Sequence, residues 1–175
     1  MTLPLPLRKL ALTAHIVASV GWIGADAVFL ALAIAGLNSP DAQLVRAAYL
    51  AMGLTAWYVI VPLSLASLLT GLILAVGTKW GLFRHYWVLT KFLIASFATL
   101  ALLVHTEPIR LLAGAAAEAT LAGGALHEPR LQLVVAAGGG LLFLLVNTVL
   151  GVYKPRGLTP YGWRKQLEQR GLSRR

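Results

Sequence analysis

The chain has 175 residues, of which 58% are hydrophobic and only 12% are charged, and its net charge at neutral pH is +9. A mean hydropathy of +0.77 is typical of a membrane protein and excludes an ordinary soluble domain. The positive charges lie at the ends of apolar segments and in the C-terminal tail, which argues against nucleic-acid binding. Because the chain has no cysteine, disulfides, thiolate metal sites and iron–sulfur clusters are excluded.

The first apolar segment, residues 10–35, is long enough to cross a bilayer, which takes about 20 residues. It contains two ionisable residues, His15 and Asp26, whose 11-residue spacing places them within about 20° of one another on a helix. Ser19, Trp22 and Phe29 fall near the same face. An ionisable side chain in lipid costs about 2.5 kcal/mol or more, so this face is expected to contact other helices, water or a ligand.

Three more apolar segments follow, at about 48–77, 86–106 and 131–153. The sequence therefore predicts an all-α fold, an integral membrane four-helix bundle made by residues 1–155 and followed by a basic tail at 156–175. The connection between the third and fourth spans is longer than a turn. Its Ala and Leu content predicts a short helix on the outer surface.

Lys and Arg residues are distributed unevenly between the two sides of these spans. Eleven of the 15 fall on the side of the two termini, and three fall on the other side. The first group is Arg8, Lys9, Lys79, Arg84, Lys154, Arg156, Arg164, Lys165, Arg170, Arg174 and Arg175, and the second is Arg46, Arg110 and Arg130. The positive-inside rule then predicts that both termini are cytoplasmic. Aromatic and basic residues in the tail also predict contact with anionic lipids.

Polar residues of all four spans fall at similar depths in the inner third of the bilayer. On a helical rise of 1.5 Å per residue, His15 lies level with Lys91 of the third span, Ser67 of the second and Asn147 of the fourth. Asp26 lies slightly to the outer side of the bilayer centre, close in depth to Tyr58. Tyr58 is one candidate partner for its carboxyl group. We therefore expect the four helices to converge on something that these polar groups bind.

Two short motifs carry a family resemblance. The pattern His15-x6-Trp22-x-Gly24, together with the run from Arg84 to Lys91 and the later His105, resembles three groups of small bacterial membrane proteins. These are the HemJ-type protoporphyrinogen oxidases, the CopD-type copper-resistance proteins and an uncharacterised four-span family. The resemblance implies a location in the bacterial inner membrane. It also implies that His15 ligates haem b and that Lys91 lies near a propionate or a substrate carboxylate.

The histidines offer several pairings for such a haem. His15 and His105 differ by about 23 Å in height, so they do not share one iron. His85 is the better partner for His15, with an offset of about 7 Å, and His105 is then left to pair with His127. Five-coordinate iron on His15 alone is equally compatible. The candidate metal ligands are therefore these four histidines.

Further site residues complete the prediction. Ser19, Trp22, Lys91 and Asn147 join His15 as candidate cofactor-binding residues. Lys91 and Asp26 are the candidate catalytic groups, with Lys91 holding an anion and Asp26 passing protons.

Three functional hypotheses follow. The first is a haem-b membrane redox protein, an oxidase or electron carrier whose partner is a tetrapyrrole or a quinone. The second is a small copper or proton-coupled transporter that uses His15, Asp26 and His105 as stepping groups. The third is a non-catalytic subunit or membrane anchor. The three hypotheses differ on whether the protein is an enzyme, and the sequence does not decide between them. All three are compatible with a homo-oligomer.

Overall fold

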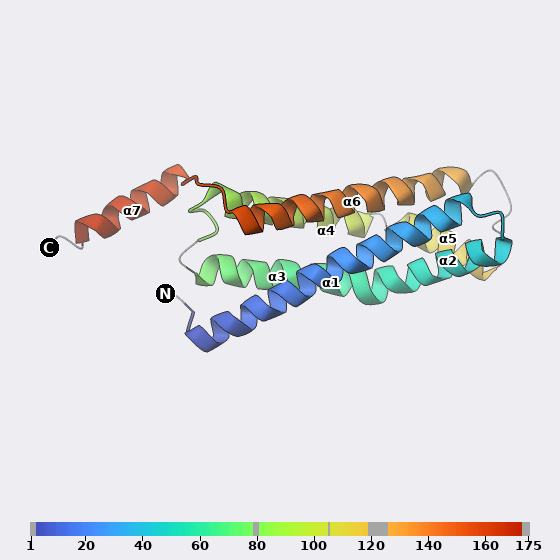
Figure 1. Ribbon diagram of the computed structural model, residues 1–175, viewed down its shortest axis with the longest axis horizontal. Coiled ribbons are helices and arrows are strands. Elements are labelled where there is room, and N and C mark those ends of the chain that lie inside the picture. The colour runs from blue at the N-terminus through green and yellow to red at the C-terminus, as the bar shows by residue number, and fades with distance from the viewer. Residues whose placement is uncertain (1–2, 79–80, 105, 119–125, 173–175) are drawn as a thin grey trace.

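The computed structural model describes residues 3–78, 81–104, 106–118 and 126–172, and all the elements within them are helices. The helices form an elongated bundle, with both chain ends at the same end of it (Figure 1). Four helical segments are long and apolar enough to cross a membrane, which confirms the predicted all-α fold with four membrane-length helices. The elements are α1 Leu5–Asn38, α2 Ala42–Thr55, η1 Ala56–Ile60, α3 Val61–Gly77, α4 Tyr86–Val104, α5 Thr106–Ala117, α6 His127–Tyr153 and α7 Pro160–Leu172.

The second membrane-length segment is built from three pieces, because a proline interrupts it. Pro62 has no backbone N–H and its ring crowds the carbonyl four residues earlier. The five residues before Val61 form a π-helical turn, η1, which widens the helix at this place. The chain thereby continues from α2 into α3 without a break, and the segment runs from Ala42 to Gly77, six residues longer at its start than predicted.

The third membrane-length segment consists of α4 and α5, and residue 105 between them lies outside the described residues. The short helix on the outer surface between the third and fourth spans stays a prediction. Helix α5 is part of the third membrane-length segment. It packs along α2 and also touches α6, and it buries Ile109, Leu112 and Ala116. Arg46 of α2 fastens its C-terminal end by donating from Nε to the carbonyl oxygen of Ala116 at 2.8 Å.

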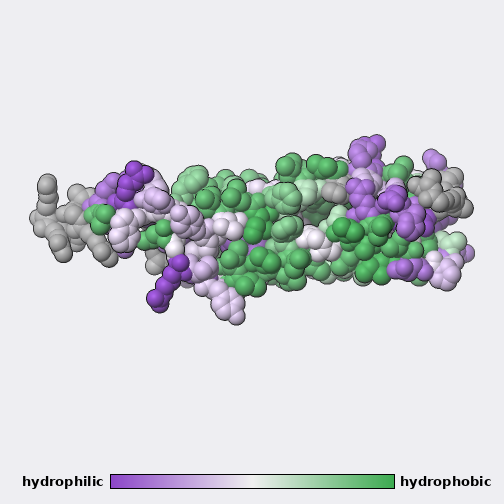
Figure 2. All heavy atoms as spheres, turned by 90° about the horizontal axis from the view of Figure 1, so that it is seen from above, coloured by the Kyte–Doolittle hydropathy of each residue, from purple (hydrophilic) through white to green (hydrophobic). Residues whose placement is uncertain are grey.

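The core is formed where α1 packs against α2, α3 and α6. Its largest fully buried side chains include Tyr49, Met52 and Leu133. Close approach of α1 and α2 depends on Gly36, because a Cβ there would lie 2.7 Å from the Cζ atom of Tyr49. On the face drawn in Figure 2, apolar residues cover the middle of the bundle and hydrophilic residues gather towards both ends, as expected for a protein that spans a bilayer.

The last helix, α7, is fixed to the loop that precedes α4. The Thr159 backbone N–H donates to the carbonyl oxygen of Arg84 at 3.1 Å, and the Thr159 hydroxyl donates to the carbonyl oxygen of Phe83. That hydroxyl also accepts a hydrogen bond from the Gly162 N–H at 3.0 Å, which caps the first turn of α7. The basic tail therefore begins as an ordered helix that extends beyond the end of the bundle (Figure 1).

Candidate functional site

A cavity of about 320 Å³ lies between α1, α3, α4 and α6, near the end of the bundle that holds both termini. Its lining includes three of the candidate site residues, His15, Lys91 and Asn147. Arg8 of α1 and Lys154, which follows α6, line it as well. Since no Asp or Glu is among the described residues that line it, we call this space the basic cavity. Polar groups predicted to share one depth are thus brought together in one place.

Hydrogen bonds to α3 determine the tautomer of His15. Its Nδ1 lies 3.0 Å from the carbonyl oxygen of Ser67 and 3.1 Å from the hydroxyl oxygen of Thr70. The carbonyl is only an acceptor, and the Thr70 hydroxyl donates its own hydrogen to the carbonyl oxygen of Ala66 at 2.6 Å. Nδ1 therefore carries the proton and donates it. In the neutral ring, Nε2 is left with a lone pair that can ligate a metal ion.

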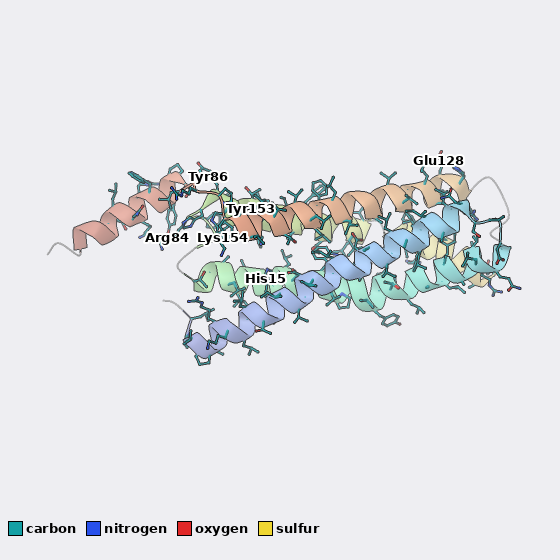
Figure 3. All side chains as sticks on the ribbon, viewed as in Figure 1. His15, Arg84, Tyr86, Glu128, Tyr153 and Lys154 are labelled. Carbon is teal, nitrogen blue, oxygen red and sulfur yellow. The ribbon has the colours of Figure 1, made fainter. Side chains whose placement is uncertain are left out.

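The Lys91 ammonium group lies against α6 at a position that has no side chain. A Cβ on Gly151 would lie 2.5 Å from Lys91 Nζ, so the glycine provides the room for this group. Lys154 adopts a left-handed conformation, with φ of 44°, just where α6 ends. Figure 3 shows Lys154 at the same end of the bundle as His15. Repulsion between these cations is relieved when an anion enters the cavity.

Asn147 and Ser19 occupy different roles in this region. The Oδ1 atom of Asn147 is buried and has no hydrogen-bond partner within the described part of the chain, so it is available to a ligand that donates a hydrogen bond. The Ser19 hydroxyl is hydrogen-bonded to that of Ser67 at 2.8 Å, which joins α1 to α3 beside the cavity. Ser19 therefore holds the wall in place and does not itself line the cavity.

The remaining candidate metal ligands are not gathered around His15. His85 forms an isolated β-bridge with Leu158 and stacks obliquely on Trp87, and it is not among the residues that line the basic cavity. His127 is the first residue of α6, at the end of the bundle far from His15, and its neighbour Glu128 is labelled there in Figure 3. His105 lies outside the described residues. Among the described residues, no three His, Asp or Glu side chains are close enough to share a metal ion.

Comparison with known proteins gives no match to this chain: no family model, no curated protein and no solved structure. The resemblance to HemJ-type and CopD-type proteins therefore stays a prediction.

A second cavity, of about 600 Å³, lies between α1, α4 and α6 and contains Asp26 and Trp22. Asp26 is 7% exposed, and its Oδ2 atom has no hydrogen-bond partner within the described residues. Tyr58, one candidate partner for this carboxyl group, is 77% exposed on the outside of the bundle and does not face the cavity. Within the described part of the chain, the ionisable residues that line this space are Asp26 and Glu128, so we call it the acidic cavity. Trp22, predicted beside His15, thus belongs to a different cavity.

Sequence reasoning missed Arg8 and Lys154 as site residues, although both were counted for topology. A signal was present, because Arg8 precedes His15 by seven residues and Lys154 follows Asn147 by seven. Seven residues make about two helical turns, so each basic residue lies near the face of the polar residue it accompanies. Nothing in the sequence indicated the role of Gly151. That role depends on the Lys91 side chain of α4, which reaches the surface of α6 at this position.

Proposed function

We propose that the chain is a multi-pass protein of the bacterial inner membrane, with both termini cytoplasmic, that binds haem b in the basic cavity and acts in electron transfer. One observation carries the proposal. A histidine with its Nδ1 proton bound to a backbone carbonyl lines the same cavity as Lys91 and Arg8, with no carboxylate among the lining residues. This combination suits a ligand that has a metal centre and acidic groups.

The His15 ring has the arrangement that metal-ligating histidines usually have. Such histidines donate their second ring N–H to a carbonyl or carboxylate, which fixes the tautomer and raises the basicity of the ligating nitrogen. Here Ser67 supplies that carbonyl. Gly71 faces the imidazole, and a Cβ there would lie 3.1 Å from Cε1, so the ring is closely packed and cannot turn freely. These contacts support His15 as the residue that would ligate the iron of a bound haem.

The cations of the basic cavity favour a carboxylate-bearing tetrapyrrole over a quinone. Haem b carries two propionates, and Lys91, Arg8 and Lys154 offer charge-assisted hydrogen bonds to them. A quinone has no charge, so three cations give it no matching advantage. Apolar side chains such as Leu12, Leu68 and Phe92 lie beside these groups and suit the macrocycle. The cavity volume of about 320 Å³ lies at the lower end of the usual range for small-molecule sites, about 300–1,000 Å³.

Copper carriage, the alternative from the sequence, is less well supported. A copper site needs several soft or imidazole ligands together, and the chain has no cysteine and two methionines. His15 is the one histidine among the residues that line the basic cavity. A haem needs only one or two protein ligands, since its macrocycle supplies the other four. The ligand set in this cavity therefore favours haem.

When bound, haem b supplies one-electron redox chemistry through its iron. The residues of this chain have simpler tasks. Lys91, Arg8 and Lys154 would hold and orient the carboxylates. The surrounding apolar side chains exclude water and lower the local dielectric constant, which strengthens each of these interactions.

Absorption spectroscopy of the full chain, purified in detergent from haem-replete cells, tests the proposal. We expect a Soret band that is abolished by His15→Ala and retained in His127→Ala, a matched control at the other end of the bundle. A colourless wild-type protein, or an unchanged band in His15→Ala, would refute haem binding at this site. Elution as a monodisperse peak in size-exclusion chromatography shows that each variant is folded.

A further inference from the structure

The acidic cavity is not used by the proposed haem site, although it is the larger of the two cavities described above. Its walls come from α1, α4 and α6, with contributions from η1 and α5. Most of its lining is apolar or aromatic, including Trp22, Phe97 and Phe143. Alanine and glycine residues of α6 leave the space open where larger side chains would fill it. Such a cavity suits a ligand with a bulky apolar body.

Asp26 provides the specific polar feature of this space. Its side chain is more than nine-tenths buried by exposed area, and Oδ2 lacks a hydrogen-bond partner among the described residues. Gly140 of α6 is directly opposite, and a Cβ there would lie 3.3 Å from Oδ2. A buried carboxyl group without a partner is costly in a protein interior. Its retention at a cavity wall points to a partner that is not part of the chain.

The charges of the two cavities are opposite in sign. Among the described residues, the acidic cavity is lined by Asp26 and Glu128 and by no Lys, Arg or His, whereas the basic cavity has cations and no carboxylate. Glu128 lies towards the far end of the bundle from His15 and Lys154 (Figure 3). An anionic ligand would therefore be repelled by the acidic cavity. A cation with an apolar body would gain from both the carboxylate and the aromatic rings.

We propose that the acidic cavity binds an amphiphilic cation, a molecule with a bulky apolar body and one positive charge, with its charged centre at Asp26 and its apolar groups against the aromatic walls. Phe97 of α4 and Phe143 of α6 form an edge-to-face pair with ring centroids 5.7 Å apart. Both rings are also exposed on the outside of the bundle, at 57% and 43%. They mark the side from which a lipid-dissolved ligand enters between the two helices.

Tetraphenylphosphonium is the probe that tests this proposal, because tetraphenylborate has the same four-phenyl shell with the opposite charge. Equilibrium dialysis of the detergent-solubilised full chain is expected to show saturable phosphonium binding and, in a separate dialysis without phosphonium, no saturable binding of tetraphenylborate. Asp26→Asn, which keeps the side-chain shape, is expected to weaken binding at least about tenfold. Glu128→Gln removes the carboxylate at the rim and serves as the matched control, with a smaller effect than Asp26→Asn.

Equal phosphonium affinity in wild type and Asp26→Asn would overturn the proposal, and so would equal binding of the borate. A measurement on the wild-type protein covers the case in which Asp26→Asn does not fold. An apolar carbodiimide is expected to label Asp26, as located by mass spectrometry, and the phosphonium is expected to slow that labelling. Labelling of Asp26 at an unchanged rate under saturating phosphonium would also overturn it. None of these outcomes depends on whether haem binds at His15.

Discussion

Lys91 and Gly151 are matched across the interface between α4 and α6. A Cβ at position 151 would lie 2.5 Å from Lys91 Nζ, a separation that ordinary side-chain contacts do not allow. The absence of a side chain on α6 thus determines where the lysine ammonium can lie. Since Lys91 lines the basic cavity, this one glycine controls the position of a charge on which the proposed anion site depends.

The first prediction follows from that pairing. Gly151→Ala is expected to displace the Lys91 ammonium and to weaken haem binding about tenfold, because a charge-assisted hydrogen bond is worth about 1.5–3 kcal/mol. The dissociation constant is measured by Soret titration of haem-free protein. Gly139→Ala is the matched control, since a Cβ at that position of the same helix meets no atom within 4 Å. Equal dissociation constants for the two variants would contradict the role given to Lys91.

The second prediction concerns the packing of α1 on α2. Gly36→Ala is expected to lower the free energy of unfolding by about 1–3 kcal/mol, because the new methyl group would overlap the rigid, buried ring of Tyr49. Thermal unfolding in detergent measures the effect as a lower Tm. On the same helix, Gly24 has no neighbour within 4 Å of its hypothetical Cβ. Gly24→Ala should therefore leave Tm unchanged or raise it, and an equal loss in both variants would rule out the packing explanation.

Helical periodicity was sufficient to predict which face of the first span is buried. Trp22, Asp26 and Phe29, placed near one face by their spacing, are all buried in α1. The rise per residue also placed His15 and Lys91 at one depth, and they line one cavity. These inferences succeeded because they depend only on the geometry of a single helix, which the order of residues determines.

Inferences about contacts between helices were less successful. Depth alone made His85 a partner for His15, but the chain at His85 pairs with Leu158 in the loop before α7. A similar depth in the bilayer made Tyr58 a candidate partner of Asp26. Tyr58, however, lies in the π-helical turn η1, and its side chain faces outward. The rotation of each helix about its axis depends on packing, and a wide turn before Pro62 changes it. Periodicity counted along an ideal helix contains neither effect.

The third prediction tests the attachment of α7 to the bundle. Thr159→Val keeps the side-chain shape but removes the hydroxyl that bonds the Phe83 carbonyl and caps Gly162. Loss of such a cap costs about 0.5–2 kcal/mol, so the start of α7 should detach more often. Trypsin is expected to cleave faster after the exposed Arg156, as followed by mass spectrometry. Thr148→Val is the control, because that hydroxyl donates to the Leu144 carbonyl within α6 and not to the loop that holds α7. Unchanged cleavage would show that Thr159 does not hold the helix.

The fourth prediction concerns orientation in the membrane. The chain has no cysteine, so a single introduced thiol reports its side without background. Gln43→Cys, at the start of α2, and Arg156→Cys, before α7, are both at exposed positions at opposite ends of the bundle. The excess of Lys and Arg near the termini predicts that the end with Arg156 is cytoplasmic.

A membrane-impermeant maleimide should therefore label Gln43→Cys in intact cells and leave Arg156→Cys unlabelled. In inside-out vesicles the pattern should reverse, and detergent should expose both thiols. The opposite labelling would place the basic cavity in the outer half of the bilayer, away from the anionic inner leaflet, where its cations and those of α7 would lose their proposed surroundings. Such a result would contradict the proposed topology while leaving the geometry of both cavities unchanged.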